Sequence, residues 1–555
     1  MNRETIADLL LDRVGDHRPG LRTRERTWTW NEVVAESAAR AHLARSMHSE
    51  GHGEGPFHVG VLLNNVPEYV FWLGASALSG AVIVGINPTR SGAYLEQEVR
   101  NTDCQMVVTD TASRMLIDGL DIGVPAERFL LVDTDAYAEQ VHAHATRPWR
   151  DPAIIAQTRM LLLLTSGTTG TSKAAICSQG RLTSLGYLNR DRFGITPDDT
   201  CYCCMPLFHG NALMALWAPA LVAGACVALA EKFSASRFLD DVRLHRATFF
   251  TYVGKAIGYV LATPERPGDA CTTLTRGFGT EASPEDKAEF DRRFGCRLIE
   301  GYGSSEAGGL IRLDQDGPAG ALGRPASDSV IVVNSETRQV CPPAQLDEYG
   351  RVTNAEEAVG EIVDILGAAK FEGYYNNPEA NAERVRHGWY WTGDLGYLDA
   401  AGYLYFAGRS GDWIRVDGEN ISALLTERIL RRHPKIVAAG VFAVPDPRSG
   451  DQVMAAVEVP DGNSFDDLDL STFLTRQTDL GTKGAPRYVR FSHRLPTTGS
   501  NKLRKKEMQL EGWQTSDPVY HWVGRGRPVY KVMMGDDKSA LRADFLAHGR
   551  GRFLP

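Results

Sequence analysis

The sequence has few features of a membrane, secreted or nucleic-acid-binding protein. Its formal net charge is −9, so we expect no general affinity for nucleic acid or for anionic membranes. The nine cysteines occur without C-x-x-C pairs or histidines at ligand spacing, and therefore indicate neither a zinc site nor a disulfide framework. Residues Met1–Thr5 lack the charged and apolar regions of a signal peptide, so we expect a cytoplasmic protein.

One long uncharged run, Ala212–Ala230, approaches the length of a membrane span. Pro219 and Gly224 interrupt it, and many of its other residues are alanine. This pattern is more typical of a buried helix, a turn and a strand, so we expect no transmembrane segment. The nearby cluster of Cys201, Cys203 and Cys204 favours buried strand thiols.

The N-terminal half predicts an α/β fold. At 555 residues the chain is too long for one core, and its 43% hydrophobic content is ordinary for a globular protein. Strands are predicted at 58–63, 81–84 and 105–109, with helices at 66–79 and 92–101 between them. This alternation, which resumes from 180 to 250, indicates βαβ units and a parallel sheet.

The second half has a different pattern. Short strands at 330–333, 360–366 and 402–407 predict a small antiparallel sheet or distorted barrel. A compact α+β region follows, with a helix at 424–432 and strands at 437–444 and 453–459. We therefore predict a large N-terminal domain over 1–408, a small α+β domain over 409–516 and a C-terminal extension over 517–555. The sequence contains no internal repeat and no low-complexity tract.

A predicted strand of four leucines leads directly into a loop rich in hydroxyl groups, within Leu161–Lys173. Gly167 and Gly170 allow a tight turn that brings backbone N–H groups close to an anion, and Lys173 adds a positive charge. The G-x-x-x-x-G-K-[ST] spacing of the nucleotide P-loop is absent. Taken alone, the loop fits a polyphosphate cradle and a Ser/Thr-rich surface turn equally well.

Two later stretches place polar groups at strand ends or on turns. His209, in Pro206–Asn211, suits either a pocket wall or a buried imidazole. The stretch Glu300–Glu306 combines an aromatic plane, two hydroxyls and carboxylates, which could stack on a base and hold Mg²⁺ against phosphate oxygens. It also fits an ordinary Gly-rich turn.

Two further stretches follow the same logic. Tyr390–Gly396 presents Asp394 on a predicted turn, where a carboxylate suits ribose hydroxyls, although an Asx turn explains it equally simply. Arg409 closes the next strand, and Pro496–Leu503 places Lys502 on a loop ahead of a basic helix. Each stretch alone is weak evidence.

The order and spacing of these stretches resemble the acyl-activating adenylate-forming superfamily, which contains acyl-CoA synthetases, adenylation domains and luciferases. The resemblance extends from about Trp28 to Lys502. The stretches Phe249–Val260 and Arg409–Asn420 resemble the bacterial fatty-acid–CoA ligase branch, near the fatty acid transport proteins and very-long-chain acyl-CoA synthetases. The resemblance implies a large domain of parallel βα layers plus a small distorted barrel, and a mobile C-terminal domain that turns about Arg409–Asp412.

The resemblance also implies roles for single residues. Catalysis would rest on Lys502, which stabilises the α-phosphate, with Glu306, Thr165 and His209; Glu306 would also bind Mg²⁺. The implied ATP contacts are Thr165, Ser166, Gly167, Thr168, Thr169, Gly170, Lys173, Gly279, Thr280, Glu281, Glu300, Gly301, Tyr302, Gly303, Ser304, Ser305, Asp394, Tyr405, Arg409 and Lys502. Residues 277–283 would line the acyl channel, and residues 418–420 would face the thiol acceptor.

The sequence departs from its relatives at two places. Asn501 stands where a second glycine commonly precedes the lysine, but asparagine tolerates positive φ, so we expect Lys502 to remain competent. Glu281 is a carboxylate near an acyl pocket, which needs an arginine partner or a polar or amine-bearing substrate.

We therefore expect ATP- and Mg²⁺-dependent activation of a small-molecule acid as an adenylate, followed by transfer to CoA. The alternative is an adenylate-forming ligase that passes the activated group to an amine, or a diazotase that activates nitrite. A nucleotide-sensing module without catalysis is disfavoured, because the catalytic lysine is present. The resemblance also allows a homodimer.

Overall fold

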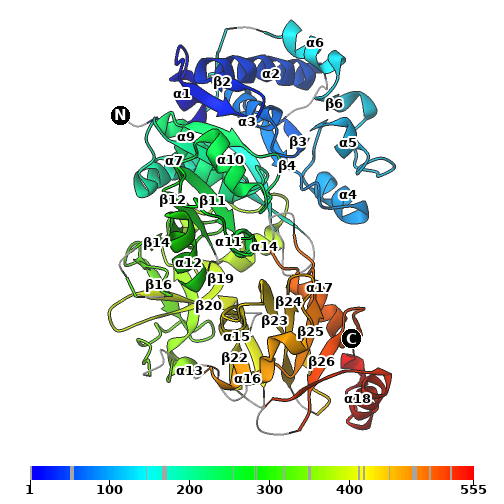
Figure 1. The fold of residues 1–555 in the computed structure, drawn as a ribbon. Helices are drawn as coiled ribbons and strands as arrows, with labels where there is room; N and C mark the ends of the chain where they lie inside the picture. Colours follow the sequence, from blue (N-terminus) through cyan, green and yellow to red (C-terminus); the bar gives the residue numbers. More distant parts are fainter. Residues whose placement is uncertain are drawn as a thin grey trace.

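Two sheets of mostly parallel strands form the N-terminal part of the molecule, shown in blue to green in Figure 1. The computed structural model describes residues 3–50, 55–145, 147–165, 172–253, 255–280, 282, 284–314, 317–318, 320–347, 352–409, 413–416, 419–448, 450–477, 480, 484–498, 502–524 and 528–554. The first sheet has the order β6 (Phe129–Leu131), β5 (Met106–Thr109), β3 (His58–Leu62), β4 (Val82–Gly85), β7 (Arg159–Thr165) and β8 (Lys173–Ser178).

The second sheet has the order β13 (Arg297–Glu300), β12 (Arg276–Thr280), β11 (Phe249–Val253), β9 (Thr200–Cys203), β10 (Cys226–Leu229), β1 (Pro19–Arg22) and β2 (Thr27–Thr29). Neighbouring strands in both sheets run parallel, except for the antiparallel pairs β7–β8 and β1–β2. The parallel α/β fold expected from the alternation is confirmed.

Helices pack on these sheets, and one apolar cluster spans both sheets while a second packs on the first sheet. The helices are α1 (Ile6–Leu11), α2 (Trp30–Glu50), α3 (Pro67–Ser79), α4 (Gly92–Asn101), α5 (Thr111–Arg114), η1 (Ala126–Arg128), α6 (Asp135–Ala143), α7 (Gln179–Phe193), α8 (Gly210–Ala212), η2 (Leu213–Trp217), α9 (Ala218–Ala223), α10 (Phe238–His245), α11 (Lys255–Leu261) and α12 (Pro284–Phe294). Leu161, Leu162 and Leu163 of β7 are buried and Leu164 is half-buried, because β4 and β8 flank the strand and apolar clusters cover it, as expected for a central strand.

Helix α3 shows why these segments fold locally. Pro67 occupies the first turn, where its missing N–H is not needed, and Gly80 ends the helix in the left-handed region at φ 79°. Every residue from Tyr69 to Leu78 is buried, and such an all-round apolar helix belongs inside a core.

The apolar run at 212–230 forms the helix, turn and strand that the sequence predicts. Residues of η2 and α9 are almost entirely buried, Gly224 turns the chain at φ 76°, and β10 follows. Among the described residues, no helix has the length and apolarity needed to cross a membrane.

A smaller sheet with the order β16 (Val330–Val333), β17 (Gly360–Asp364), β19 (Trp389–Leu398) and β18 (Val385–Arg386), with β20 (Leu404–Arg409) also paired to β19, follows the parallel sheets. All of these pairs are antiparallel. Its accompanying elements are β14 (Ile311–Arg312), β15 (Arg324–Pro325), α13 (Ala355–Ala358), η3 (Gly367–Ala369) and α14 (Pro378–Arg384).

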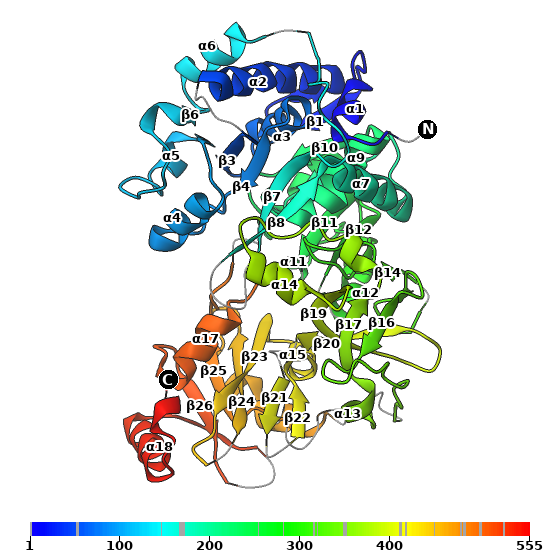
Figure 2. The ribbon, with the colours of Figure 1, turned by 180° about the vertical axis from the view of Figure 1, so that it is seen from behind.

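The C-terminal part, yellow to red in Figures 1 and 2, has its own five-stranded sheet. Its strand order is β23 (Ala438–Pro445), β24 (Asp451–Glu458), β25 (Tyr488–Ser492), β26 (Val519–Trp522) and β27 (Tyr530–Val532). The other elements are β21 (Trp413–Val416), β22 (Glu419–Ser422), α15 (Ala423–Arg431), η4 (Asp466–Leu468), α16 (Leu470–Thr475), α17 (Lys505–Glu511), η5 (Gly512–Gln514), α18 (Gly535–Ala547) and η6 (Gly551–Phe553).

The segment from 517 onward, which the sequence interpretation set apart as an extension, contributes two strands to this sheet. Strand β26 pairs antiparallel with β25, and the ring of Tyr520 stacks on Phe465 with centroids 3.6 Å apart. Phe545 of α18 is fully buried against Trp513. Strand β26 and helix α18 therefore both pack into the core of the C-terminal part. Helix α18 lies at the opposite end of the molecule from α2 (Figures 1 and 2).

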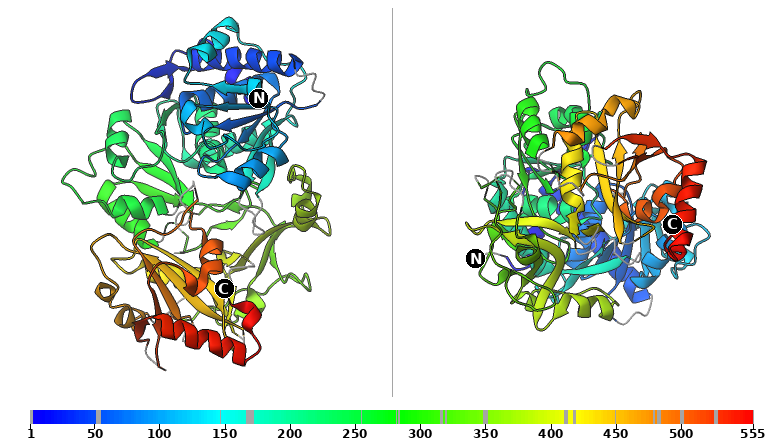
Figure 3. Two further views of the ribbon diagram at one scale, coloured as in Figure 1. Left: turned by 90° about the vertical axis from the view of Figure 1, so that its right-hand side faces the viewer. Right: turned by 90° about the horizontal axis from the view of Figure 1, so that it is seen from below.

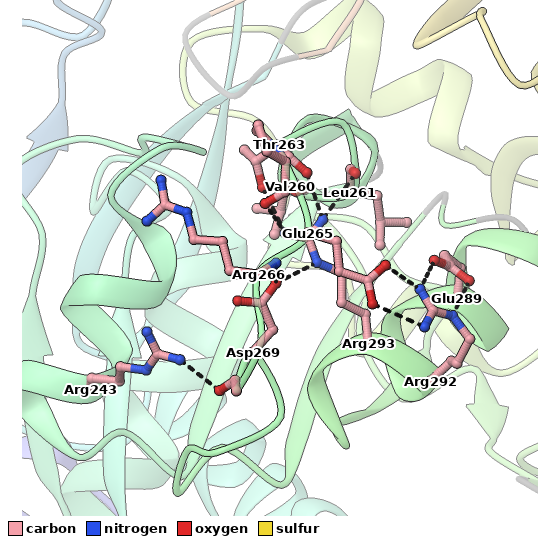
Figure 4. Close-up of polar contacts among 12 residues, drawn as sticks. Arg243, Val260, Leu261, Thr263, Glu265, Arg266, Asp269, Glu289, Arg292 and Arg293 are labelled. Carbon is pink, nitrogen blue, oxygen red and sulfur yellow. Dashed lines mark hydrogen bonds and ion pairs between the residues drawn. The ribbon is translucent and has the colours of Figure 1, made fainter.

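An ionic network joins α12 to the chain that follows α11 (Figure 4). Arg293 is 4% exposed and donates to the Asp269 carboxylate at 2.8 Å. It also donates to the carbonyl oxygens of Leu261, Thr263 and Pro264. One buried guanidinium thus fixes the end of α11 against α12, and these two helices face the C-terminal part.

Candidate active site

The carboxyl ends of β11, β12 and β13 meet at one edge of the second sheet, where ligands of parallel sheets bind. The Gly301 N–H donates to the Gly279 carbonyl at 2.9 Å and continues the pairing beyond the strands. A Cβ at Gly279 would lie 2.4 Å from the Tyr252 carbonyl, and one at Gly301 would lie 2.4 Å from the Phe278 ring. Only glycine fits at both positions, so the backbone itself forms this surface.

Glu300 and Tyr302 are held in place by hydrogen bonds. The Tyr252 hydroxyl donates to Glu300 Oε1 at 2.6 Å, and the Ala282 N–H donates to the same oxygen at 3.2 Å. The Tyr302 hydroxyl donates to Asp394 Oδ2 at 2.8 Å. Burial, together with the Asp394 carboxylate, raises the pKa of Tyr302 well above its ordinary value, so this phenol remains a neutral donor.

Asp394 lies inside β19, not on the turn that the sequence predicts. Three residues, 392–394, oppose the single residue Ile362 of β17, and Gly393 takes φ 73° within this bulge. The Gly393 N–H donates to Glu361 at 2.8 Å, while the Asp394 N–H donates to Thr392 Oγ1 at 3.1 Å. The bulge turns the Asp394 carboxylate toward Tyr302.

The backbone of Arg409 lies directly opposite Asp394, because the two residues are register partners in the β19–β20 pair. The structure therefore brings the two predicted ribose residues to one place. Residues 410–412, the rest of the predicted hinge, lie outside the described residues.

The predicted metal ligand and the predicted phosphate lysine meet at Tyr374. The Tyr374 hydroxyl donates to Glu306 Oε1 at 2.8 Å, and the Lys173 ammonium lies 5.4 Å from the centre of the Tyr374 ring. Lys173 also pairs with Glu383 at 3.1 Å. Arg384 donates to the Tyr374 hydroxyl at 3.2 Å. These contacts fix Glu306, which is 8% exposed, beside a cation.

Glu306 fits a magnesium site that is completed by substrate. Mg²⁺ in nucleotide enzymes commonly takes one or two carboxylates plus phosphate oxygens and waters. No group of three or more His, Cys, Asp or Glu side chains in the described part of the chain could hold a metal by itself. A metal at Glu306 would therefore depend on the phosphates for its remaining ligands.

The phosphate-type loop connects two antiparallel strands, unlike the strand-to-helix connection of a P-loop. Thr165 ends β7 and is the register partner of Lys173, which begins β8. The Thr165 hydroxyl donates to the Lys173 carbonyl at 3.3 Å and closes the base of the loop. Ser166, Gly167, Thr168, Thr169 and Gly170 lie outside the described residues, so their predicted roles stay predictions.

His209 lies where α8 begins, against the 301–306 segment. A Cβ at the next residue, Gly210, would lie 3.2 Å from Ser305 Oγ. The Nε2 atom of His209 is buried and has no hydrogen-bond partner among the residues that the structure describes. Burial, followed by the charges of Lys502 and Arg90, lowers the pKa of His209 to about 4, so the imidazole is neutral near pH 7.

Lys502 approaches the same place although it is far away in sequence. Its N–H donates to Thr498 Oγ1 at 3.1 Å, and its carbonyl accepts from the Thr498 N–H at 2.7 Å, so two hydrogen bonds join these residues. A cleft of about 1200 Å³ between the N- and C-terminal parts is lined by Lys173, Thr280, Glu300, Gly301, Tyr302, Gly303, Asp394 and Lys502, among others.

Three predicted residues, Tyr405, Ser304 and Ser305, make other contacts than those predicted. Tyr405 stacks on Tyr397 with ring centres 4.9 Å apart and donates to Asp399 at 3.2 Å, while its neighbour Phe406 lines the cleft. Ser304 Oγ accepts the Ala307 N–H at 3.1 Å and stabilises its own turn. The Ser305 carbonyl accepts from Arg181 at 2.7 Å. Glu281 lies outside the described residues.

The cleft also contains cations that the sequence interpretation missed. Arg90 follows β4, the strand beside β7, and Arg384 ends α14. The position of Arg90 just after a parallel strand is a signal that could have found it, because such positions share one sheet edge. Arg384 follows no strand of either parallel sheet, and nothing in the sequence marks it.

The low pKa of His209 gives a test by titration. We expect its imidazole to stay neutral from about pH 5.5 to 8, so it should add no limb to the pH–rate profile there. Because the folded-state pKa is depressed, its stabilising contribution is full above the unfolded value and is lost as pH falls toward 4. NMR of ring-¹³C-labelled histidine, assigned with a His209→Gln variant, measures the pKa of this imidazole. Titration near pH 6.5 would contradict it, and Lys502→Ala should raise the pKa.

The fold, and the cleft that gathers Lys173, Tyr302, Asp394 and Lys502, fit an adenylate-forming enzyme. Comparison with known proteins agrees. The chain matches the AMP-binding enzyme family over residues 12–375 and the AMP-binding enzyme C-terminal domain over residues 425–502. The chain belongs to the AMP-binding enzyme family.

Two curated relatives align over nearly their whole lengths. The chain is 62% identical to the steroid-22-oyl-CoA synthetase of Rhodococcus jostii over 555 residues, which cover 100% of this chain and 99% of the relative. It is 41% identical to the medium/long-chain-fatty-acid–CoA ligase FadD17 of Mycobacterium marinum, over 93% of this chain and 98% of the relative. The chain is an AMP-forming acid–CoA ligase that uses ATP and CoA.

Solved structures confirm the fold. ATP-bound MatB from Rhodopseudomonas palustris superposes with a TM-score of 0.76 at 22% identity, over 92% of this chain and 99% of that one. The anthranilate CoA ligase AuaEII in complex with anthranoyl-AMP gives 0.79 at 18% identity, over 91% and 96%.

Proposed function

We propose that the acid substrate is a steroid carrying a carboxylate on its side chain, at the position named by the steroid-22-oyl relative. The observation that supports this is 62% identity to that relative across the whole length of both chains. The reaction would join the carboxylate oxygen to the α-phosphorus of ATP and release pyrophosphate. The CoA thiol would then displace AMP from the mixed anhydride and form the thioester. We further propose that the enzyme acts in the cytoplasm. We also propose that it forms a homodimer, and sedimentation velocity would measure its oligomeric state.

Within this proposal the charged side chains of the cleft serve the first step. Lys502 would place its ammonium group on the α-phosphate, where negative charge develops. Lys173 would hold the departing pyrophosphate, and Glu306 would bind Mg²⁺, which neutralises phosphate charge when bound. Tyr302 would stack on the adenine, with Asp394 and Arg409 on the ribose.

The two steps would differ in how the two domains are arranged. We propose that residues 1–408 form the stationary domain and that residues from 409 onward move as one body that carries Lys502. The present arrangement fits adenylation, because Lys502 already lies close enough to lower the pKa of His209. Figure 3 shows the C-terminal part resting against the rest of the chain from two further sides.

Three polar contacts hold this arrangement. The Tyr259 hydroxyl of α11 donates to Glu458 Oε1 at 2.9 Å, and Glu458 Oε2 accepts the Leu495 N–H at 2.9 Å. Helix α15 contacts α12 through Arg431 and Asp286, 2.7 Å apart, and Glu285 lies 3.6 Å from the following residue, Arg432. The contacts Tyr259–Glu458, Asp286–Arg431 and Glu285–Arg432 cross from the stationary to the mobile part, and the bond to Leu495 holds Glu458 in place.

The Tyr259→Phe variant should therefore slow adenylation more than thioester formation. It removes one hydrogen bond to a carboxylate, and such a bond contributes about 1.5–3 kcal/mol. Rapid-quench measurement of adenylate formation, and of thioester formation from preformed adenylate, separates the two steps. Tyr403→Phe is the control, because Tyr403 donates to the exposed Asp314 away from the domain contact. Equal slowing of both steps would exclude this role.

A panel of acids tests the substrate proposal. Steroid C22 acids, medium- and long-chain fatty acids and benzoate would each be incubated with ATP, Mg²⁺ and CoA, and the thioester mass would be followed. We expect the highest kcat/KM for the steroid acids. Preference for fatty acids would favour the substrate class of the 41% identical relative and would reject the proposal. Amine-dependent AMP release without CoA would support the amide-forming alternative instead.

A further inference from the structure

A buried carboxylate connects the end of the phosphate loop to a cation that no prediction assigned. Glu98 of α4 is 6% exposed and lies beside an apolar cluster that includes Leu95 and Val99. Its Oε1 accepts the hydroxyl hydrogen of Ser172, the residue before Lys173. The same oxygen lies 3.5 Å from Arg90 Nε. One carboxylate oxygen therefore fixes both Ser172 and Arg90.

Burying such a carboxylate is costly, and this one is only partly compensated. Its other oxygen, Oε2, is buried and has no hydrogen-bond partner in the part of the chain that the structure describes. Burial raises the pKa of Glu98, against the opposing effects of Ser172 and Arg90. A purely structural tie between a loop and a helix does not need a buried charge, since neutral partners would cost less.

Arg90 is one of the cations that line the cleft. The Asn87–Ser91 segment follows β4, the strand that pairs with β7, and Arg90 lines the same cleft as Lys173 and Lys502. Glu98 contacts Arg90 at Nε, on one side of the guanidinium, and the two terminal nitrogens bond to no residue that the structure describes, so they can reach a ligand. The Arg90 side chain is 24% exposed, open enough for a ligand and closed enough to limit screening.

We propose that Arg90 is a second cation of the pyrophosphate subsite, and that Glu98 positions it beside Lys173. This inference rests on the proposed adenylation reaction. A guanidinium presents parallel N–H groups that match two phosphate oxygens, whereas an ammonium group acts as a point charge. Arg90 would bind the β- and γ-phosphates of ATP and keep hold of the pyrophosphate as it leaves.

The position of Arg90 favours ATP over the phosphates of CoA as its ligand. Arg90 shares its anchoring oxygen with Ser172, so it lies at the described end of the phosphate loop. It is also close enough to His209 to lower the pKa of that imidazole together with Lys502. Lys502, and Lys173 next to Ser172, both belong to the residues proposed for the first half-reaction.

The test compares three variants in acid-dependent ATP–pyrophosphate exchange. Arg90→Met keeps most of the side-chain volume and should raise the KM for ATP and for pyrophosphate about tenfold or more, the factor expected for one charge-assisted contact. Arg90→Lys should recover part of this loss. Arg100→Met is the matched control, because Arg100 lies on α4 but pairs with Asp121 outside the cleft.

The KM for CoA distinguishes the two sources of phosphate. We expect it to be unchanged in Arg90→Met when thioester formation starts from preformed adenylate. An increase in the KM for CoA with normal ATP–pyrophosphate exchange would overturn the proposal. A fall in melting temperature with unchanged KM values would show a structural role only and would overturn it as well.

Glu98→Gln tests the positioning role, since glutamine can still accept the Ser172 hydrogen bond but cannot pair with Arg90 as a charge. We expect a smaller increase in the same two KM values. The double variant Arg90→Met/Glu98→Gln should be no worse than Arg90→Met alone, because Glu98 acts through Arg90. Additive losses would mean that Glu98 has a separate role.

A binding measurement keeps this inference separate from the proposed function. Calorimetric titration of MgATP and of magnesium pyrophosphate, without any acid, needs no turnover. Weaker binding by Arg90→Met than by the Arg100→Met control supports the subsite even if no tested acid is activated. Equal binding by the two variants overturns it even if the wild-type enzyme proves to be a steroid–CoA ligase.

Discussion

Replacing Lys502 by alanine should lower the rate of adenylate formation by about two to three orders of magnitude, while ATP binding changes little. Removing one preorganised donor from developing transition-state charge costs roughly 2.7–4 kcal/mol. The ammonium group lines the cleft with Lys173, Tyr302 and Asp394. Acid-dependent ATP–pyrophosphate exchange measures this step, and equilibrium titration with MgATP measures binding.

The second half-reaction provides the internal comparison. The Lys502→Ala variant should convert preformed acyl-adenylate and CoA to thioester at close to the wild-type rate, because the lysine is needed only while pyrophosphate leaves. Lys538→Ala on α18 is the control for removing a lysine elsewhere in the C-terminal part. If exchange survived in Lys502→Ala, or if both steps failed together, the proposed role would be wrong.

Replacing Arg293 by methionine should cost about 3–5 kcal/mol of unfolding free energy, because it leaves a buried charge without its partner. Asp269 is 3% exposed and Arg293 is 4% exposed (Figure 4). Burial acts to raise the pKa of Asp269, but the hydrogen bonds from Arg293 and from the Arg266 N–H, together with the charges of Arg293 and Arg243, outweigh it and hold that pKa below its ordinary value. The ion pair therefore stabilises the fold above the unfolded pKa, and this contribution is lost as pH falls. Denaturant titration at neutral and acidic pH measures both effects.

The adjacent Arg292 gives a matched control for that variant. It forms two ion pairs, with Glu265 and Glu289, but all three side chains are about half exposed. Exposed pairs contribute little because water and salt screen them. Arg292→Met should therefore leave stability nearly unchanged. If the two variants lost equal stability, burial would not be the cause.

The sequence predicted the elements whose local pattern of apolar residues agrees with their burial in the folded chain. Leu161–Leu163 of β7 and Tyr69–Leu78 of α3 are buried, as their composition requires. The motif residues Glu300, Tyr302, Asp394 and Lys502 also line one cleft, as the resemblance implies. Their individual catalytic roles stay predictions.

Features that depend on the partner strand could not be predicted from local sequence. Asp394 looks like a turn residue because Thr392, Gly393 and Asp394 are turn formers, yet β17 converts the stretch into a bulge. Tyr405 and Phe406 alternate in direction along β20, and the sequence does not show which of them faces the cleft. Arg90 depends on Glu98, eight residues away on a different element.

Strands β26 and β27, within residues 519–532, also protect the C-terminal part from aggregation. Without β26 and β27, strand β25 would form the outer edge of the sheet, with a row of unpaired backbone groups open to a second chain. Phe545 and Tyr520 cover apolar side chains that would otherwise meet water. A protein shortened at residue 516 would therefore expose an aggregation-prone edge on the part that we propose moves between the two half-reactions.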